Sequence, residues 1–576
     1  MYDLVIRNGT VFDGTGADAR RADVAVMGQL IAVVGEIDET LVGPDTVVVD
    51  ATDRIVTPGF VDAHTHYDGQ ITWDPFVTPS TFHGVTTVVT GNCGVGFAPC
   101  RPEQRDWLIG LMEGVEDIPG TALHEGIQWD WESFPEYLDA LDTKEFAIDV
   151  ATQVPHGAVR AYVMGDRGPA HEVATPDEVA EMKQVVKQAI EAGALGFTTS
   201  RTEKHKDSSG VLTPSIDAHE AELTGIAEAL GELDAGVLQG ISDFHDFDAE
   251  FAMFRRMVEV SGRPCSITVE QQDARPEWWQ QLLDAVTEAQ ADGLPMLGQV
   301  PPRATGVLLG LTATLHPFSF HPSYRRLHRL SLEEKVAELR RPEVREALLA
   351  EECALPEGTL AREIVTGFHK MFRLGDPAEY EPTPDRSFAA LAEVAGVSPL
   401  EIALDAMLEK DGAALIYHPL FNYLPGDLSF VQEMLEHPHT RMGLSDGGAH
   451  CGVISDVSFP TTLLQHWGRD RTAGPKLPLP QLVSMHTKET AELVGLEDRG
   501  VLAPGYLADV NVIDFERLAP REPVVEYDLP AGGRRLVQRA DGYDLTIKRG
   551  VVVFRDGEPT GEVPGQLIRG AQPSPA

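Results

Sequence analysis

Two histidines lie one residue apart in the segment DAHTHYD (residues 62–68), directly after the apolar run RIVTPGFV. Side chains at positions i and i+2 of an extended strand point to the same side, so His64 and His66 can converge on one point. Such a pair favours a metal ion, although two hydrogen-bonding histidines at a strand end are the simpler alternative. The acidic neighbour, the preceding glycine and the strand that leads into the pair favour the metal.

Three further residues able to bind a metal follow other apolar runs. Cys93 stands in TGNCGVG, His156 in VPHGAVR and Asp446 in GLSDGGAH. Taken singly, each has an ordinary explanation: a small buried thiol, a histidine that hydrogen-bonds to its neighbours, and a helix cap. Because the carboxyl ends of parallel barrel strands meet at one face, the residues together predict one shared site.

Eight apolar segments that alternate with helical stretches are predicted to be the strands that position these residues. Such alternation is typical of a parallel sheet covered on both faces, and eight strands are the number that closes a TIM-type (β/α)8 barrel. One intervening helix is predicted over 175–193, with a proline near its start and a glycine at its end. The strands are predicted at 56–66, 84–94, 146–157, 194–201, 236–244, 265–271, 294–302 and 440–448.

Both ends of the chain show short alternating strands with Asn-Gly and Asp-Gly turns. This pattern predicts a small β-sandwich domain built from residues 1–55 together with 500–576. Residues 56–499 then form the barrel, with a charged helical insertion near 320–400. The insertion either covers the barrel mouth or presents an ordinary solvated face.

Composition excludes several classes of partner. The 576 residues carry a formal net charge of -44, which repels nucleic acids and anionic membrane surfaces. No apolar run is long enough to cross a bilayer, and the opening MYDLVIRNGT lacks the pattern of a secretory signal. The five cysteines are scattered and form no CxxC pair, which is typical of a reducing compartment. We therefore expect a cytoplasmic enzyme with a small-molecule substrate.

A series of motifs, in order along nearly the whole chain, resembles the amidohydrolase superfamily and, within it, the N-acyl-D-amino-acid deacylase (D-aminoacylase) group. The resemblance implies a metal-dependent (β/α)8 barrel flanked by a small β domain made from both chain ends. It is compatible with a homo-oligomer. The motifs are YDLVIRNGTVFDGTG, TPGFVDAHTHYD, GVTTVVTGNCGVGFAP, GLSDGGAH and TKETAELVGLEDRGVLAPGYLADVNVIDF.

The resemblance also implies roles for individual residues. His64, His66 and Asp446 match metal ligands on strands one and eight, and Cys93 matches the thiolate ligand on strand two. Thiolate coordination favours zinc over magnesium or calcium. Zn²⁺ would activate a water molecule and polarise the amide carbonyl, while Asp446 takes the proton of the water and later delivers one to the leaving amine.

The sequence departs from this group at strands five and six, where each strand of the deacylases brings a histidine to the metal. Ile241 and Val269 take those positions here, and neither side chain can bind a metal. Because these two ligands are missing, we expect a single zinc ion per chain rather than a binuclear centre. If the alignment is shifted by one residue, other side chains take the two positions. The alternative groups are Ser242, Asp243 and Glu270, with His245 a few residues beyond strand five.

The residues expected to bind the substrate also differ from those of the deacylases, because Gln271 stands where the deacylases carry a basic residue after strand six. Arg201 and Arg303 are the alternative cations for a substrate carboxylate, unless they are ordinary surface charges. His156 and His450 are further candidates for contact with the substrate.

Residues 203–207, EKHKD, are predicted to form a charged loop that could also line the barrel mouth. Its lysines lie beyond the end of strand four, which argues against a carbamylated lysine bridge of the hydantoinase type.

The favoured function is hydrolysis of a linear amide in a small N-acylated amine, such as an N-acyl amino acid. One alternative is a cyclic amide hydrolase of the hydantoinase or dihydropyrimidinase kind. The other is a barrel without catalytic activity that serves as an interaction protein, which the two missing histidines motivate. His64, His66 and Asp446 argue against that last alternative, since an idle barrel has no need for three buried polar ligands.

Overall fold

Parallel strands pair around a closed ring in the computed structural model, which describes residues 1–575. One row of the ring is β6-β7-β8 and the other is β9-β10-β11-β12-β13-β17. Only Gln153 separates β8 from β9, and a parallel bridge from Thr65 to Gly447 joins the first strand to the last. The eight predicted barrel strands are thereby confirmed. The third strand is interrupted at Gln153 and comprises β8 Asp149–Thr152 and β9 Val154–Pro155. The other seven are β6 Phe60–Asp62, β7 Val85–Thr90, β10 Gly196–Arg201, β11 Val237–Ser242, β12 Cys265–Thr268, β13 Met296–Val300 and β17 Thr440–Met442.

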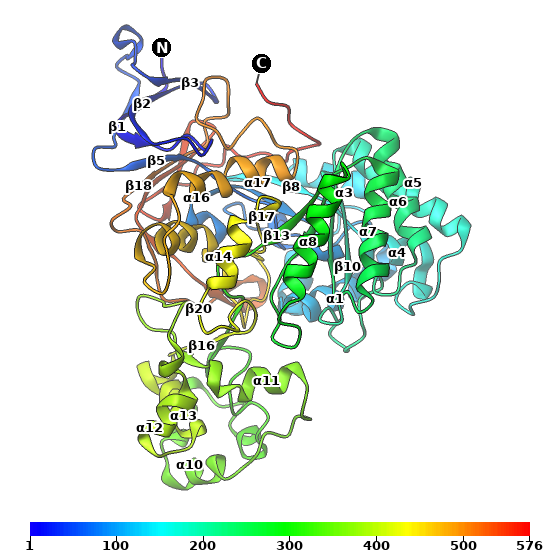
Figure 1. The fold of residues 1–576 in the computed structure, drawn as a ribbon, viewed down its shortest axis with the longest axis vertical. Coiled ribbons are helices and arrows are strands. Elements are labelled where there is room, and N and C mark those ends of the chain that lie inside the picture. The colour runs from blue at the N-terminus through cyan, green and yellow to red at the C-terminus, as the bar shows by residue number, and fades with distance from the viewer. Residues whose placement is uncertain (576) are drawn as a thin grey trace.

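Helices cover the outside of the barrel, as Figure 1 shows around β10. The predicted helix over 175–193 is α5, Pro176–Ala192. Thr175 and Glu178 form a capping box at its start, and Gly193 ends it in the left-handed conformation with a φ of 117°. Its neighbours α6 (Glu220–Leu233), α7 (Phe247–Ser261) and α8 (Trp278–Ala291) follow the next three strands in the same way.

Strands from both ends of the chain pair in one nine-stranded sheet, and Figure 1 places both termini on the same side of the barrel. The junction lies where β5 pairs with β1 in parallel and with β18 antiparallel. The strands in spatial order are β25 Glu558–Pro559, β24 Val551–Arg555, β23 Tyr543–Lys548, β18 Val510–Ile513, β5 Ile55–Pro58, β1 Leu4–Val11, β2 Arg20–Met27 and β3 Leu30–Gly35, and β4 Val47–Asp50 also pairs with β1.

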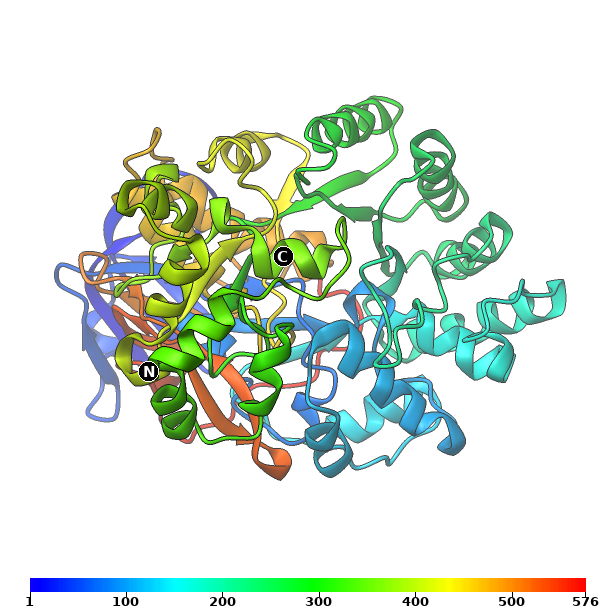
Figure 2. The same cartoon turned by 90° about the horizontal axis from the view of Figure 1, so that it is seen from below.

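The insertion between β13 and β17 forms a lobe, residues 306–419, that lies below the barrel in Figure 1 and faces the viewer in Figure 2. A three-stranded sheet carries it, and it has a hydrophobic cluster of its own around Phe318, Leu339 and Phe388. Its elements are β14 Gly306–Leu309, α9 Leu332–Leu339, α10 Pro342–Leu349, α11 Leu360–Thr366, β15 Phe372–Arg373, α12 Phe388–Ala395, α13 Pro399–Met407 and β16 Ile416–Pro419.

No helix within residues 1–575 has both the length and the apolar composition that a bilayer-spanning segment needs.

A buried ion cluster joins the third barrel strand to the terminal sheet. The carboxylate of Asp149 on β8 lies 2.7 Å from Arg499 Nη1, 2.8 Å from Lys548 Nζ and 2.9 Å from Arg549 Nη2. Burial alone would raise the pKa of Asp149, but Lys548 and the two arginines hold it well below its usual value. Asp149 therefore stays ionised as the shared counter-ion of three cations.

We expect Asp149→Asn to destabilise the protein strongly, because it leaves the buried Arg549 without a counter-ion and removes one of the two carboxylates that Arg499 and Lys548 each contact. The loss for breaking a buried ion pair is about 3–5 kcal/mol, seen as a lower midpoint in urea unfolding. Asp139→Asn is the matched control, since Asp139 pairs with Arg569 at 2.8 Å but is 72% exposed. Equal midpoints for the two variants would contradict the role of the cluster.

Candidate active site

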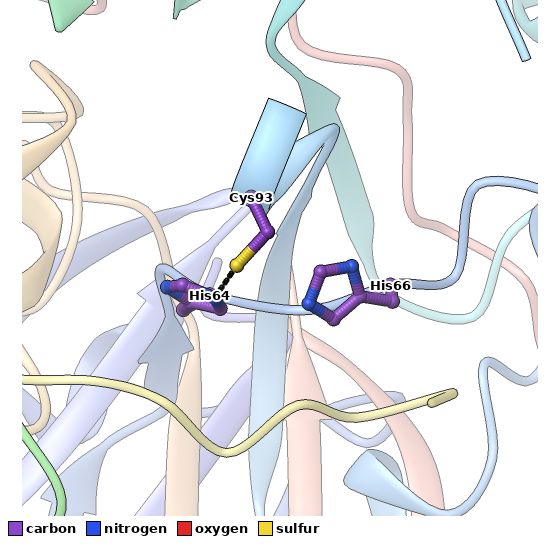
Figure 3. Close-up of side chains that lie close together, drawn as sticks. All are labelled: His64, His66 and Cys93. Atoms are coloured by element: carbon purple, nitrogen blue, oxygen red, sulfur yellow. Dashed lines mark hydrogen bonds between the residues drawn. The ribbon is translucent and has the colours of Figure 1, made fainter. Parts of the chain in front are cut away.

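His64, His66 and Cys93 come together at the carboxyl end of the barrel strands. The histidines lie just after β6, and Cys93 lies in a short turn, Asn92–Gly94, after β7. One ligand atom from each residue lies within 4.8 Å of those of the other two, and all three residues are buried. Figure 3 shows the arrangement, with His64 Nε2 3.3 Å from Cys93 Sγ.

The local backbone explains how Cys93 reaches the histidines. Cys93 has a φ of 53°, so the chain turns sharply there in the left-handed region that non-glycine residues rarely adopt. The side chain of Asn92 secures the turn by donating hydrogen bonds to the carbonyls of Thr65 (3.1 Å) and Val89 (2.8 Å). The backbone N–H of Cys93 donates to Gln239 Oε1.

Asp446 joins the cluster from the segment after β17. Its Oδ1 lies 3.4 Å from His64 Nε2 and 3.6 Å from His66 Nε2. Burial alone would raise the pKa of Asp446, but the hydrogen bond from His66 and the charges of the nearby histidines keep it well below its usual value. Asp446 is therefore a carboxylate beside the histidine and cysteine ligands.

His64 is held in a form that can bind a metal. Its Nδ1 donates to Gln299 Oε1 at 2.8 Å, and the amide nitrogen of Gln299 donates in turn to Ser266 Oγ. Burial lowers the pKa of His64 to about 4, so the ring is neutral. With Nδ1 engaged, the lone pair of Nε2 is free to face Cys93 and Asp446.

Glu116, the last residue of α1 (Arg105–Glu116), belongs to the same cluster although no sequence motif indicated it. It is only 1% exposed, and its Oε1 lies 3.3 Å from His66 Nδ1. Burial alone would lower the pKa of His66, but attraction to Glu116 raises it well above its usual value. One sequence signal could have indicated it: Glu116 follows Leu108 and Met112 at four-residue spacing, so it lies on the apolar face of its helix.

The cluster fits a metal ion on its own chemistry. His66 Nδ1 is buried and faces Glu116 Oε1 at 3.3 Å without forming a hydrogen bond, and burial raises the pKa of the Cys93 thiol to about 11. A buried imidazole, thiol and carboxylate stabilise one another little unless a cation lies between them. Two imidazole nitrogens, a sulfur and a carboxylate oxygen are the donors that zinc prefers.

Three residues predicted to contact the substrate do not line the cavity beside the cluster. His156 has both ring nitrogens engaged, at 2.8 Å each, with Thr199 Oγ1 and Glu222 Oε1. Arg201 donates to the carbonyl of Ala218.

Arg303 is 1% exposed, lies 2.8 Å from Asp456 and packs over the ring of Tyr380. His156, Arg201 and Arg303, which the sequence predicted as substrate contacts, are therefore each engaged in interactions within the protein, and none of them lines the cavity.

His450 does line the cavity. Its Nε2 lies 3.7 Å from Glu116 Oε2 and 3.9 Å from Asp446 Oδ2. It is therefore close enough to both carboxylates to contact a molecule bound at the cluster.

Strands five and six present no histidine to the cavity within the described residues. Ile241 lines it, as the sequence predicted, whereas Val269 is buried and its neighbours Thr268 and Glu270 line it instead. Of the groups that a one-residue shift would present, Glu270 alone reaches the cavity. Ser242 donates to Glu250, Asp243 accepts from Thr202, and His245 is 54% exposed beside Glu203.

The cavity has a volume of about 180 Å³, which is below the roughly 300–1,000 Å³ of pockets for drug-sized ligands. Lys204 and His205 enter it from the loop after β10, so part of the EKHKD segment does line the mouth. Leu360 of the lobe, together with Leu420 and Phe421 just after β16, supplies an apolar wall. The insertion thus contributes directly to the site.

The known proteins that this chain resembles are amidohydrolases and N-acyl amino acid deacylases. A model described as the amidohydrolase family matches residues 47–554. An N-acyl-D-glutamate deacylase of Alcaligenes xylosoxydans xylosoxydans is 27% identical over 576 residues, covering 98% of this chain and 96% of that protein. A D-aminoacylase of the same organism is 36% identical over 198 residues, covering 34% of this chain and 37% of that protein.

Solved structures share the fold. The N-acyl-D-glutamate deacylase of Bordetella bronchiseptica, solved with zinc and a phosphonate inhibitor, has a TM-score of 0.64 at 23% identity and covers 99% of each chain. A D-aminoacylase has a TM-score of 0.65 at 23% identity, with 99% of this chain and 100% of the other covered. These matches confirm the predicted barrel with its small β domain. The chain therefore belongs to the amidohydrolase family of metal-dependent hydrolases.

Proposed function

We propose that the protein hydrolyses the amide bond of a small N-acylated amine, an N-acyl amino acid, with one zinc ion per chain. The observation that carries the proposal is the buried cluster of His64, His66 and Cys93, with the Asp446 carboxylate within 3.6 Å of both histidines. This set provides the three or four ligands that a catalytic zinc needs, with a position left for water. Zinc held there would polarise the substrate carbonyl and make the attacking water more acidic.

Asp446 is the proposed general base and acid. Its carboxylate is ionised and lies 3.4 Å from His64 Nε2 and 3.6 Å from His66 Nε2, so it is placed beside the proposed metal ligands to accept a proton from the attacking water. The same carboxyl group can then deliver a proton to the leaving amine. His450 Nε2, 3.9 Å from Asp446 Oδ2, is placed to contact the substrate beside it.

The count of one metal rests on what strands five and six present. A second ion beside Cys93 would need ligands from these strands, and the cavity shows Ile241, Thr268 and Glu270 there. Glu270 is engaged with Lys204 at 3.1 Å. The remaining donors suffice for a single ion.

Two observations support an N-acyl amino acid as the substrate. A relative that matches nearly the whole chain is named an N-acyl-D-glutamate deacylase. The cavity is small and has apolar walls, which suits a short acyl group next to the metal ligands.

The first prediction concerns metal content. Elemental analysis of protein purified without added metal should find about one zinc per chain, and His64→Ala should contain much less, because it removes one of the two imidazole ligands and breaks the buried set. His124→Ala is the control, since the side chain of His124 is 55% exposed on a surface helix. Two metals per chain would contradict the single-ion proposal, and no metal after zinc is offered would favour the idle barrel.

The second prediction concerns Asp446. Asp446→Asn should lower kcat for N-acyl amino acid hydrolysis by a factor of about 10²–10⁴, the usual contribution of a general base, while circular dichroism shows an unchanged fold. Asp139→Asn should retain full activity. Turnover of Asp446→Asn equal to that of the wild type would rule out the assigned role.

The third prediction concerns Glu116 as a positioning residue for His66. Carboxylates that hold a metal-bound histidine contribute about 10–100-fold to metal affinity. Glu116→Ala should therefore weaken zinc binding by about that factor in a chelator competition titration, and Glu116→Gln should lose less. Asp106→Asn, on the same helix and 92% exposed, should leave zinc affinity unchanged. Unchanged affinity in Glu116→Ala would show that the carboxylate does not support the ligand.

A further inference from the structure

Two charged side chains line the cavity without a part in the proposed hydrolysis. Lys204 lies in the loop after β10, and Glu270 follows the end of β12. Lys204 Nζ donates a hydrogen bond of 3.1 Å to Glu270 Oε2. Their side chains are 25% and 13% exposed, so a molecule in the cavity can reach both.

The pair has hydrogen-bonding capacity left over. The Lys204 ammonium has three N–H donors, of which Glu270 takes one, and it lies 4.3 Å from the centre of the Phe421 ring. Glu270 Oε1 accepts from Thr305 Oγ1 at 3.2 Å, and a carboxylate offers about four lone-pair sites. Lys204 can bind one further anionic group, and Glu270 one further cationic group, while the hydrogen bond between them is kept.

Lys204 is the only lysine or arginine among the cavity-lining residues of the described chain. Arg201 and Arg303 are both engaged away from the cavity. Away from the proposed metal ligands, a carboxylate on the substrate therefore has Lys204 as its lysine or arginine partner, and it meets Glu270 at the same time.

The charges of the site favour a dipolar group over a lone carboxylate. A lone carboxylate beside Lys204 is attracted by the ammonium but repelled by Glu270 at only a slightly greater distance. Because the Coulomb energy falls only with the inverse of distance, the repulsion cancels much of the attraction.

We propose that Lys204 and Glu270 are specificity-determining residues that select amides whose amine part carries an ammonium and a carboxylate together. An amino acid acylated on its side-chain nitrogen has this character: its dipolar head binds the Lys204–Glu270 pair, and its amide lies at the metal ligands. The inference rests on the proposed amide hydrolysis and specifies its substrate.

The experiment measures binding separately from turnover. Calorimetry of zinc-loaded wild-type protein uses three methanesulfonamide ligands, which are not cleaved as amides: Nε-methanesulfonyl-lysine, the same compound without its ammonium, and the same compound without its carboxylate. The dipolar ligand should bind about tenfold or more tightly than either analogue, the effect of one hydrogen bond between charged groups. The ornithine series tests a shorter chain in the same way.

Two variants and a control assign the preference to the pair. Glu270→Gln should remove the advantage of the dipolar ligand over the carboxylate-only analogue. Lys204→Met should reduce the dipolar ligand to the affinity of the ammonium-only analogue. Lys206→Met, exposed in the same loop, should change neither ratio.

The outcomes separate the two proposals. Equal affinities for the three ligands in both series, or ratios unchanged in both variants, would overturn this inference and leave the Lys204–Glu270 pair a purely structural contact. Hydrolysis of the matching acetamides is assayed in parallel. Turnover without the binding order overturns only the charge selection, whereas the binding order without turnover overturns the proposed hydrolysis.

Discussion

The hydrogen bond from the backbone N–H of His66 to the carbonyl of Gly447, 2.8 Å long, is the contact on which the site depends. It joins the segments after the first and last barrel strands and so brings Asp446 to the two histidines. The chain approaches so closely that a Cβ on Gly447 would lie 2.7 Å from Ser80 Oγ and 3.0 Å from the Tyr67 ring. A glycine is therefore required where the ring of strands closes, and this local need fixes the position of Asp446, the proposed general base.

Sequence alone predicted the parts of the site that strand ends provide. His64, His66, Cys93 and Asp446 each follow an apolar run, and a parallel barrel brings such positions to one face whatever its loops do. Glu116 was not predicted, although its four-residue spacing from Met112 places it on the buried face of its helix; its contact with His66 depends on tertiary packing, which this spacing does not show.

The substrate contacts were the weakest part of the prediction for a related reason. Arg303 and His156 stand at strand ends, where a functional role is the natural expectation. Their partners Asp456 and Glu222 come from distant segments and engage them inside the protein. Lys204, which does line the cavity, lies in a loop beyond the end of its strand and contacts Glu270. The sequence shows which residue stands at a strand end, but it does not show which distant side chain that residue contacts.

The terminal sheet can form only after the end of the chain has been synthesised. Val56 on β5 pairs with Val512 on β18, more than 450 residues later in the chain. At a synthesis rate of roughly 5–20 residues per second, the partner strand emerges from the ribosome about half a minute or more after the first. Until then the early strands present an open edge, and the barrel strand that carries Asp149 lacks its buried cations. Contacts so distant in sequence favour slow folding, and the nascent chain passes through this exposed stage every time it is made.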